Sequence, residues 1–537
     1  MRSDGADAGL RPSGRRPRIP GGGPQTVADV LARPVAERPR AEALVGRHRR
    51  YTYAELDAAV DRAAGALIDL GTSPGTRVAA CLGNHPDIVI AFLGAMRIGA
   101  VWVGINVALA PPEKAYMMED TGTSILLTDT AMLEGMHSSV GLPASLDEVV
   151  TVDETGAGEW SALLTEAEPD RPDIDVDPFA PAAIAFTGGT TGFPKGAVHS
   201  QHNLLLPGTM QRAAGMVEPG SRQGVCLPLT ILNLMIMHPL VSFQNDAVCV
   251  TMDRTDAVGM AELIRDERIN SFSSVPAQLH DLLTHDEIPD EWLRSLTRPG
   301  VGGAELPGAF RRLYEERFGG ILLNGYGMTE APSAVALTDT TKTVEGGETF
   351  VALPHVEISV RDGHDAVLPT GEEGEVCVGP ATTGQWKGVY TPMLGYWGRP
   401  DDTERTLAGG VLHTGDVGVM NDDGGLHLSG RRGEMIIRGG ANVYPAEVER
   451  VLHDHPAVAA CAVLGRPDER LGECVVAFVE PEPGATDDAD FGIAAKLTTH
   501  CHRNLARYKV PDEFILVESF ERTPMGKIRL EPLRALL

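Results

Sequence analysis

The chain lacks the cysteine patterns that build disulfide frameworks or zinc sites. Its 537 residues include seven cysteines, an odd number, and no Cys-x-x-Cys pair. This spacing is typical of a reduced, intracellular protein and argues against a cysteine-based zinc site. His199 and His202 lie close together, but no third ligand accompanies them, so we predict no metal site there. We expect a cytoplasmic location.

The chain also lacks a segment that reads as a membrane anchor. Residues 1–25 are rich in Arg, Gly and Pro and have no apolar stretch, so they do not resemble a secretory signal, and we predict a disordered tail. Residues 88–110 are long enough to span a bilayer, but Arg97 lies near their middle. A buried helix followed by a core strand is the better interpretation.

Positive charge is scarce relative to negative charge. The chain has 46 Lys and Arg against 74 Asp and Glu, a formal net charge of −28. This balance argues against nonspecific binding to nucleic acid or to an anionic membrane. We therefore expect no nucleic-acid partner and no membrane span, and a monomer or homodimer.

What the chain does contain is a regular alternation of helix-like and strand-like segments from residue 26 onwards. Apolar spacing predicts a helix over 53–70, a strand over 77–82 and, later, a strand over 321–324 that leads directly into the string Gly-Tyr-Gly-Met-Thr-Glu at 325–330. This alternation predicts an α/β fold with parallel sheets covered by helices. Ligand residues are then expected at the carboxyl ends of the strands.

Two changes of texture divide the chain. After about residue 350, short strands and glycine turns suggest a β-barrel-like subdomain, and near residues 430–433 a small α+β unit begins. Because 537 residues exceed one ordinary core, more than one domain is expected. We predict a large N-terminal domain over 26–432, with two sheets, helices and the barrel-like part. A small mobile α+β domain is predicted over 433–537.

The most informative stretch is a loop of glycine and threonine that ends in lysine, Thr187-Gly-Gly-Thr-Thr-Gly-Phe-Pro-Lys-Gly196. Small residues let backbone N–H groups approach phosphate oxygens, while the hydroxyls and the ammonium add hydrogen bonds and charge. A Walker A loop would place Lys directly after Gly, whereas Phe193 and Pro194 intervene here, and proline has no N–H to donate. Taken alone, the stretch is also compatible with a flexible surface loop.

Further motifs follow this loop in a fixed order. They are the strings at 302–307 (Gly-Gly-Ala-Glu-Leu-Pro), 324–330 (Asn-Gly-Tyr-Gly-Met-Thr-Glu), 413–416 (His-Thr-Gly-Asp), 430–445 and 523–527 (Thr-Pro-Met-Gly-Lys). Each is modest alone, but together they make the chain resemble the adenylate-forming superfamily. This superfamily includes acyl-CoA synthetases, nonribosomal peptide adenylation domains and firefly-type luciferases. The resemblance covers everything except the N-terminal tail, and the string at 436–445 is most similar to acyl-CoA synthetases.

The resemblance implies a reaction in two steps. A carboxylic acid attacks the α-phosphate of MgATP to give acyl-AMP and pyrophosphate, and the thiol of coenzyme A then displaces AMP. The implied cofactors are ATP, Mg²⁺ and coenzyme A. Because a weak carboxylate nucleophile meets an anionic phosphate, catalysis must neutralise charge and hold the in-line geometry.

The resemblance also implies an ATP site. Its residues are Thr187, Gly188, Gly189, Thr190, Thr191, Gly192, Lys195, Gly303, Ala304, Glu305, Asn324, Gly325, Tyr326, Gly327, Met328, Thr329, Asp416 and Arg431. Tyr326 is expected to stack on adenine and Asp416 to accept hydrogen bonds from the ribose hydroxyls. Thr329 is expected to contact the α-phosphate, and Glu330 to bind Mg²⁺, which prefers carboxylate oxygen.

The catalytic residues implied are Lys527, Thr329 and Glu330. Lys527 is expected to offset the charge that develops in the first step. A rotation of the small domain about a hinge at Arg432 and Gly433 is then expected to withdraw it. The same rotation brings the coenzyme A loop, formed by Arg438, Gly439 and Gly440, to the pantetheine tunnel. The chain departs from the family at the hinge, where Gly433 replaces the usual Asp or Lys.

The acid and the acceptor are less constrained. Thr230 and Ile231 stand where the family often has Phe-His, and the apolar run that follows suggests a pocket for a hydrophobic acid, medium- or long-chain, cyclic or aromatic. The expected pocket residues are Ile231, Asn233, Leu234 and Gly302, although a Met/Leu run is also typical of plain core.

Three alternatives to an acyl-CoA synthetase stay open. A stand-alone adenylation enzyme that loads a carrier-protein phosphopantetheine shares the first step, and luciferase chemistry shares the same apparatus. A silent nucleotide-binding scaffold is disfavoured because Glu330 and Lys527 are both present.

Overall fold

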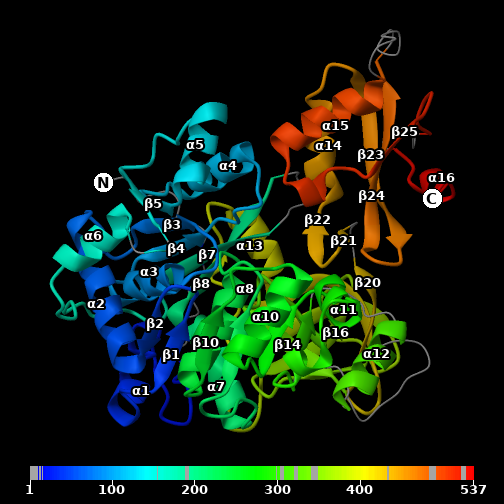
Figure 1. Ribbon diagram of the computed structural model, residues 1–537. Helices are drawn as coiled ribbons and strands as arrows, with labels where there is room; N and C mark the ends of the chain where they lie inside the picture. Colours follow the sequence, from blue (N-terminus) through cyan, green and yellow to red (C-terminus); the bar gives the residue numbers. More distant parts are fainter. Residues whose placement is uncertain are drawn as a thin grey trace.

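The computed structural model describes residues 10, 14, 16–153, 155, 157–187, 193–297, 299–302, 308–319, 324–339, 349–431, 435–482, 492–521 and 528–537. Figure 1 shows a large N-terminal unit, coloured blue to yellow, and a smaller C-terminal unit, coloured orange to red, that lies against one end of it. The described strands form three sheets, two in the N-terminal unit and one in the C-terminal unit. The fold is therefore α/β, as predicted.

The first sheet is mostly parallel and has helices on both faces. In spatial order its strands are β18 (Gly395–Tyr396), β8 (Lys195–Ser200), β7 (Pro181–Thr187), β4 (Val101–Gly104), β3 (Arg77–Cys81), β5 (Ile125–Thr128) and β6 (Glu148–Thr151). Alternate residues of a strand face opposite sides. Val78 packs in the core with α2 (Tyr53–Asp69) and α3 (Pro86–Arg97), whereas Ala79 packs in the core with α4 (Pro111–Thr121) and α5 (Thr130–Ser139).

Helices α2 and α3 explain the apolar run that resembled a membrane span. Every residue of α3 is buried, and Arg97 at its end is ion-paired with Asp57 and Asp61 of α2. A buried charge of this kind is tolerated only when it is paired. Among the helices of the described residues, none is both long and apolar enough to cross a membrane.

The second sheet continues from parallel to antiparallel without a break. In spatial order its strands are β16 (Val356–Arg361), β17 (Glu373–Pro380), β19 (Leu412–Met420), β20 (Leu426–Arg431), β15 (Thr349–Ala352), β14 (Ser333–Thr338), β13 (Asn324–Met328), β12 (Gly300–Gly302), β11 (Ser271–Ser274), β9 (Arg222–Val225), β10 (Val248–Thr251), β1 (Glu42–Val45) and β2 (Arg50–Thr52). Pairing is parallel from β13 to β1 and antiparallel from β16 to β13. The predicted barrel-like part is thus an extension of an α/β sheet.

Helices fill the remaining faces of the N-terminal unit. They are α1 (Ala32–Glu37), α6 (Glu159–Glu166), α7 (Gln201–Ala213), α8 (Leu232–Met235), α9 (Val241–Gln244), α10 (Ala257–Glu267), α11 (Pro276–Thr284), α12 (Gly308–Phe318) and α13 (Pro400–Thr406), with a π-helical turn, η2 (Ile236–Leu240). Short 3-10 turns are η1 (Val27–Asp29), η3 (Asp290–Leu293) and η4 (Ala408–Gly410).

The C-terminal unit is a five-stranded sheet with helices. Its elements are β21 (Ile436–Arg438), β22 (Ala441–Val443), α14 (Pro445–His453), β23 (Val458–Asp468), β24 (Gly472–Pro481), α15 (Ile493–Asn504), η5 (Arg507–Lys509), β25 (Glu513–Leu516) and α16 (Glu531–Arg534). It has its own apolar cores, in which Val475 and Val476 of β24 face opposite sides. The change from the large sheet to this one falls between Arg431 and Ile436.

Two expectations differ from the structure. Residues 16–25 belong to the predicted disordered tail, yet Ile19 is buried in the main core and Arg16 is ion-paired with Asp177. The Gly- and Pro-rich composition of this stretch predicted disorder, and the single isoleucine Ile19 gave no periodic signal of burial. The strand expected to end at residue 324 continues instead to Met328 as β13, whose glycines are held by ladders to β12 and β14; residues 321–323 lie outside the described residues.

Candidate active site

The ends of the predicted phosphate loop lie opposite each other. Thr187 ends β7, Lys195 begins β8, and the two residues are paired in the antiparallel ladder between these strands. The Lys195 ammonium lies 2.9 Å from a carboxylate oxygen of Asp402 in α13 and 5.6 Å from the ring centroid of Tyr396. The hairpin therefore projects its cation toward the edge of the sheet where β18 pairs with β8.

The predicted adenine and ribose residues are in direct contact. The Tyr326 hydroxyl in β13 donates a hydrogen bond of 2.7 Å to Asp416 Oδ2 in β19. Three strands, β14, β15 and β20, lie between these two strands in the sheet. The antiparallel part must therefore curl so that its face closes on itself, consistent with the barrel-like expectation. The Arg431 backbone is paired with Asp416 across the ladder of β19 and β20.

The turn after β13 carries Thr329 and Glu330 and is fixed by neighbouring elements. His199 of β8, fully buried, donates from Nε2 to the Thr329 carbonyl oxygen at 2.8 Å. Burial lowers the pKa of His199 to about 4, so the ring is neutral near pH 7 and can donate from this nitrogen. Tyr396 of β18 donates from its hydroxyl to Glu330 Oε1 at 2.6 Å.

Three predicted residues from distant parts of the chain thus meet at one edge. Lys195 and Glu330 both contact Tyr396. The Thr329 carbonyl oxygen accepts a hydrogen bond from His199, which lies in the strand that begins with Lys195. A cation that can bind phosphate and a carboxylate that can bind a metal ion thus both lie against Tyr396, which suits binding of a metal-bound polyphosphate.

The remaining members of the predicted ATP site can be placed only in part. Asn324, Gly325, Gly327 and Met328 lie in β13, so this strand carries the predicted adenine-binding string. The expectations that lie outside the described residues are those for Gly188, Gly189, Thr190, Thr191, Gly192, Gly303, Ala304, Glu305, Arg432, Gly433 and Lys527.

The predicted coenzyme A loop lies against the N-terminal unit. Gly440 has a φ of +85°, and a Cβ added there would lie 2.3 Å from Val275 Cγ1, just beyond β11. Only glycine permits this approach. The Arg438 side chain is ion-paired with Asp512 and donates to the Tyr508 carbonyl oxygen, so it holds the loop to its own unit.

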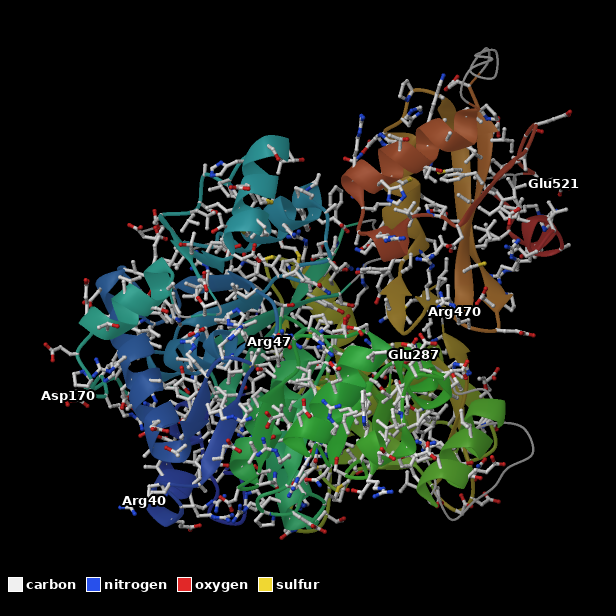
Figure 2. All side chains as sticks on the ribbon, viewed as in Figure 1. Arg40, Arg47, Asp170, Glu287, Arg470 and Glu521 are labelled. Carbon is white, nitrogen blue, oxygen red and sulfur yellow. The ribbon has the colours of Figure 1, made fainter. Side chains whose placement is uncertain are left out.

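The two units are joined at a second place by a buried cation. Lys509 Nζ lies 2.7 Å from Glu113 Oε1 in α4 and 2.8 Å from Glu447 Oε2 in α14. The Ala506 N–H also donates to Glu113 Oε2 at 2.7 Å. Helix α15 lies beside α4 at this junction (Figure 1), and side chains of both units occupy the space between them (Figure 2). The Arg450 guanidinium of α14 lies 4.5 Å from the ring centroid of Phe193, which belongs to the predicted phosphate loop.

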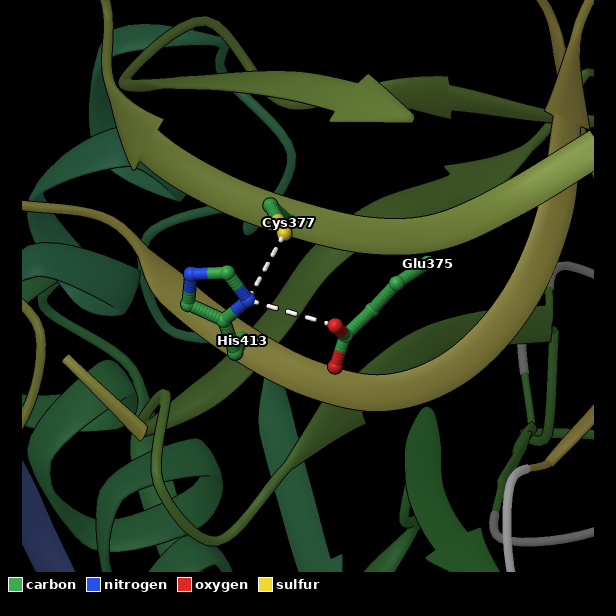
Figure 3. Close-up of side chains that lie close together, drawn as sticks. All are labelled: Glu375, Cys377 and His413. Carbon is green, nitrogen blue, oxygen red and sulfur yellow. Dashed lines mark hydrogen bonds and ion pairs between the residues drawn. The ribbon is translucent and has the colours of Figure 1, made fainter. Parts of the chain in front are cut away.

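A cluster of mixed donors lies directly before Asp416. Cys377 Sγ and Glu375 Oε2 of β17 lie 3.4 Å and 3.3 Å from His413 Nδ1 of β19 (Figure 3). Their donor atoms are within 4.8 Å of one another, a grouping that the cysteine spacing did not indicate. Burial raises the pKa of Cys377 to about 12, so the thiol is protonated near pH 7 and can donate to His413 Nδ1. Glu375 also accepts from the Gly415 N–H, and we assign the cluster to holding the strand that carries Asp416.

Where their side chains are described, the predicted acyl-pocket residues lie outside the hydrophobic core. Ile231 is exposed, Asn233 and Leu234 in α8 are half-buried, and Gly302 ends β12. The neighbouring side chains of this run, Leu232, Met235 and Ile236, belong to the main hydrophobic core. Much of the run is therefore plain core.

A parallel sheet, a curled antiparallel extension and a cation beside a carboxylate define an α/β nucleotide-dependent enzyme. The profile for AMP-binding enzymes matches residues 31–397, and the profile for their C-terminal domain matches residues 447–527. The chain belongs to the AMP-binding enzyme family, in the adenylate-forming superfamily and close to the acyl-CoA synthetases.

Individual relatives cover nearly the whole chain. The long-chain-fatty-acid–CoA ligase FadD13 of Mycobacterium tuberculosis is 29% identical over 90% of this chain and 93% of its own length. The fatty acid–acyl-carrier-protein ligase ScoC of Streptomyces coeruleorubidus is 31% identical over 95% of this chain and 96% of its own. The structure of the amide bond synthetase McbA from Marinactinospora thermotolerans is similar with a TM-score of 0.81 and 29% identity, over 95% of this chain and 99% of that one.

Sequence reasoning missed several residues that complete this site. Tyr396, Asp402 and Lys509 were not singled out, and His199 was considered only as a metal ligand. Their partners are far away in sequence, 66 residues for Tyr396 and Glu330 and 396 for Lys509 and Glu113. The string Gly-Tyr-Trp at 395–397 is the sequence feature that could have indicated Tyr396, whose ring lies beside Lys195 in the structure.

Proposed function

We propose that the protein is an ATP-dependent acyl-CoA synthetase. It joins a carboxylic acid to AMP with release of pyrophosphate, and it then transfers the acyl group to coenzyme A with release of AMP. The observation that carries the proposal is the meeting of Lys195 and Glu330 at Tyr396, next to the Tyr326–Asp416 pair. Family membership and the named acid–thiol ligases among the relatives support it.

The first step is divided among the predicted site residues. Asp416 holds the ribose and Tyr326 the adenine, Thr329 orients the α-phosphate, and Lys195 neutralises the outgoing phosphates after exchanging Asp402 for them. Glu330 is a buried carboxylate whose hard oxygen atoms suit Mg²⁺. When bound, Mg²⁺ supplies positive charge against the phosphates. Lys527 stabilises the charge on the reacting oxygens.

The second step rests on the C-terminal unit. We propose that it is mobile, that it pivots at Arg432 and Gly433, and that the arrangement with Gly440 against Val275 is the one used for thioester formation. Arg438, Gly439 and Gly440 then line the path of the pantetheine arm. We further propose that the protein acts in a reducing compartment, the cytoplasm. All seven cysteines lie among the described residues, buried and unpaired.

The acceptor is the point on which the relatives differ. Their names specify coenzyme A, an acyl carrier protein and an amide bond. Loading of a carrier-protein phosphopantetheine is therefore the second candidate, and it shares every residue of the first step. We propose a hydrophobic acid because two relatives, FadD13 and ScoC, are named for fatty acids.

A panel assay tests both points. Pyrophosphate release is measured with straight-chain acids of increasing length and with aromatic acids, each with coenzyme A, a holo-carrier protein or an amine. We expect release with hydrophobic acids, and one thioester and one AMP per pyrophosphate when coenzyme A is present. Failure to release pyrophosphate with every acid and acceptor would refute the proposal. Turnover only with the carrier protein would favour the second candidate.

A further inference from the structure

Tyr396 connects two predicted phosphate- and metal-binding residues that lie on different elements. Its hydroxyl donates to Glu330 Oε1 at 2.6 Å, and its ring lies 5.6 Å from the Lys195 ammonium. Both Tyr396 and Glu330 are less than 10% exposed. A short hydrogen bond from a neutral donor to a buried carboxylate is among the stronger ones in proteins. The contact therefore does more than fill space.

The tyrosine is itself fixed in place. Its strand pairs with β8 in the register Tyr396 to Ala197, and the Trp397 N–H donates to the Gly196 carbonyl oxygen. The Tyr396 N–H donates to Thr403 Oγ1 at 2.9 Å in α13. Backbone bonds thus place the ring beside the strand that begins with Lys195.

The chemistry of the two groups settles the direction of this hydrogen bond. An ionised carboxylate can only accept, so the Tyr396 hydroxyl donates its proton to Oε1 of Glu330. The hydrogen bond occupies Oε1 of Glu330 and fixes the plane of the carboxylate. Oε2 is then the oxygen that Glu330 presents to a cation.

We propose that Tyr396 is a positioning residue that orients Glu330 for the divalent cation bound with ATP. This rests on the proposed function, because Glu330 is a metal ligand only in an ATP-using enzyme. Residues that hydrogen-bond to a metal ligand orient it, and their loss typically weakens metal affinity by about 10- to 100-fold. Tyr396 acts through Glu330 and contacts neither substrate nor metal itself.

The test uses Tyr396→Phe, which removes one oxygen and keeps the ring. A matched control is Tyr390→Phe. Tyr390 is equally buried, and its hydroxyl has no hydrogen-bond partner among the described residues. Binding of Mn²⁺ is titrated by electron paramagnetic resonance in the presence of α,β-methylene-ATP, which cannot be cleaved. We expect about a 10-fold or greater weakening of Mn²⁺ binding for Tyr396→Phe. For Tyr390→Phe we expect a change of less than about twofold.

A double variant separates positioning from a general structural effect. If Tyr396 acts through Glu330, then Tyr396→Phe should add nothing to the loss already caused by Glu330→Gln. In pyrophosphate exchange, Tyr396→Phe should raise the Mg²⁺ concentration needed for half-maximal rate and approach the wild-type rate at saturating Mg²⁺. Unchanged Mn²⁺ binding, or additive losses in the double variant, would overturn the proposal. Because the binding titration needs no acid and no thiol, a wrong acceptor or substrate leaves this test intact.

Discussion

Replacing Glu113 with glutamine probes the junction between the two units. Glu113 Oε2 accepts from the backbone N–H groups of Ala110 and Ala506, and Oε1 accepts from Lys509. The glutamine oxygen can keep the two backbone bonds in the place of Oε2. Its NH₂ group then faces the Lys509 ammonium, which retains only Glu447 of its own unit. The change therefore weakens the contact between the units and leaves the fold of each one intact.

The magnitude follows from burial. The side chains of Lys509 and Glu113 are 7% and 10% exposed, so solvent screens their interaction little. A hydrogen bond to a charged group contributes about 1.5–3 kcal/mol net, which corresponds to a roughly 10- to 150-fold change in an equilibrium constant. We expect the arrangement in which Lys509 of the C-terminal unit contacts Glu113 of α4 to become less populated by a factor in this range.

Half-reaction assays measure the result. Transfer of preformed acyl-AMP to coenzyme A should slow by up to that factor in Glu113→Gln, while pyrophosphate exchange should be unchanged or faster. The control is Glu119→Gln, an exposed residue in the same helix, for which both rates should equal those of the wild type. Equal slowing of the two half-reactions, or no effect on acyl transfer, would refute the assignment of this arrangement to the second step.

Three further variants test other parts of the structure. Gly440→Ala places a Cβ 2.3 Å from Val275 Cγ1, so acyl transfer should fall at least 10-fold while pyrophosphate exchange persists; parallel loss of both rates would count against the docking role. Lys527→Ala should reduce pyrophosphate exchange by about 10²–10³-fold and spare the transfer of preformed acyl-AMP; an unchanged exchange rate would remove Lys527 from the mechanism. His238 is buried with no hydrogen-bond partner for either ring nitrogen among the described residues, and burial lowers its pKa from 6.5 to about 4. Between these values the unfolded chain binds a proton that the folded chain does not, so the free energy of unfolding falls as the pH drops from 6.5 toward 4. His238→Leu should therefore reduce the stability lost between pH 7 and pH 5, measured by urea unfolding, by about 1–2 kcal/mol, and an identical pH dependence in wild type and variant would contradict this.

Much of the fold could be predicted because local periodicity reports it. The helix expected over 53–70 is α2, since its apolar residues at helical spacing face one core. Strand β13 was misjudged because Gly325 and Gly327 give no local strand signal. Its conformation comes from pairing on both sides with strands that follow or precede it in the chain.

The site could be predicted only as a set of motifs. The strings around Lys195, Glu330 and Asp416 indicated the family, and in the structure Asp416 accepts a hydrogen bond from Tyr326. The side chains that hold them, Tyr396 and His199, depend on which strands pair with β8. Strand pairing depends on how the whole sheet assembles, so it cannot be predicted from the apolar periodicity of one segment.

The burial of every cysteine has a practical consequence. Burial raises the pKa of Cys226 to about 12, so neither access nor thiolate character favours reaction with a maleimide near pH 7. The paired substitutions Ser138→Cys in α5 and Thr499→Cys in α15, both at exposed positions, would then accept fluorescent dyes without removal of any native cysteine. Energy transfer between the dyes would follow the separation of the two units through a catalytic cycle, one molecule at a time.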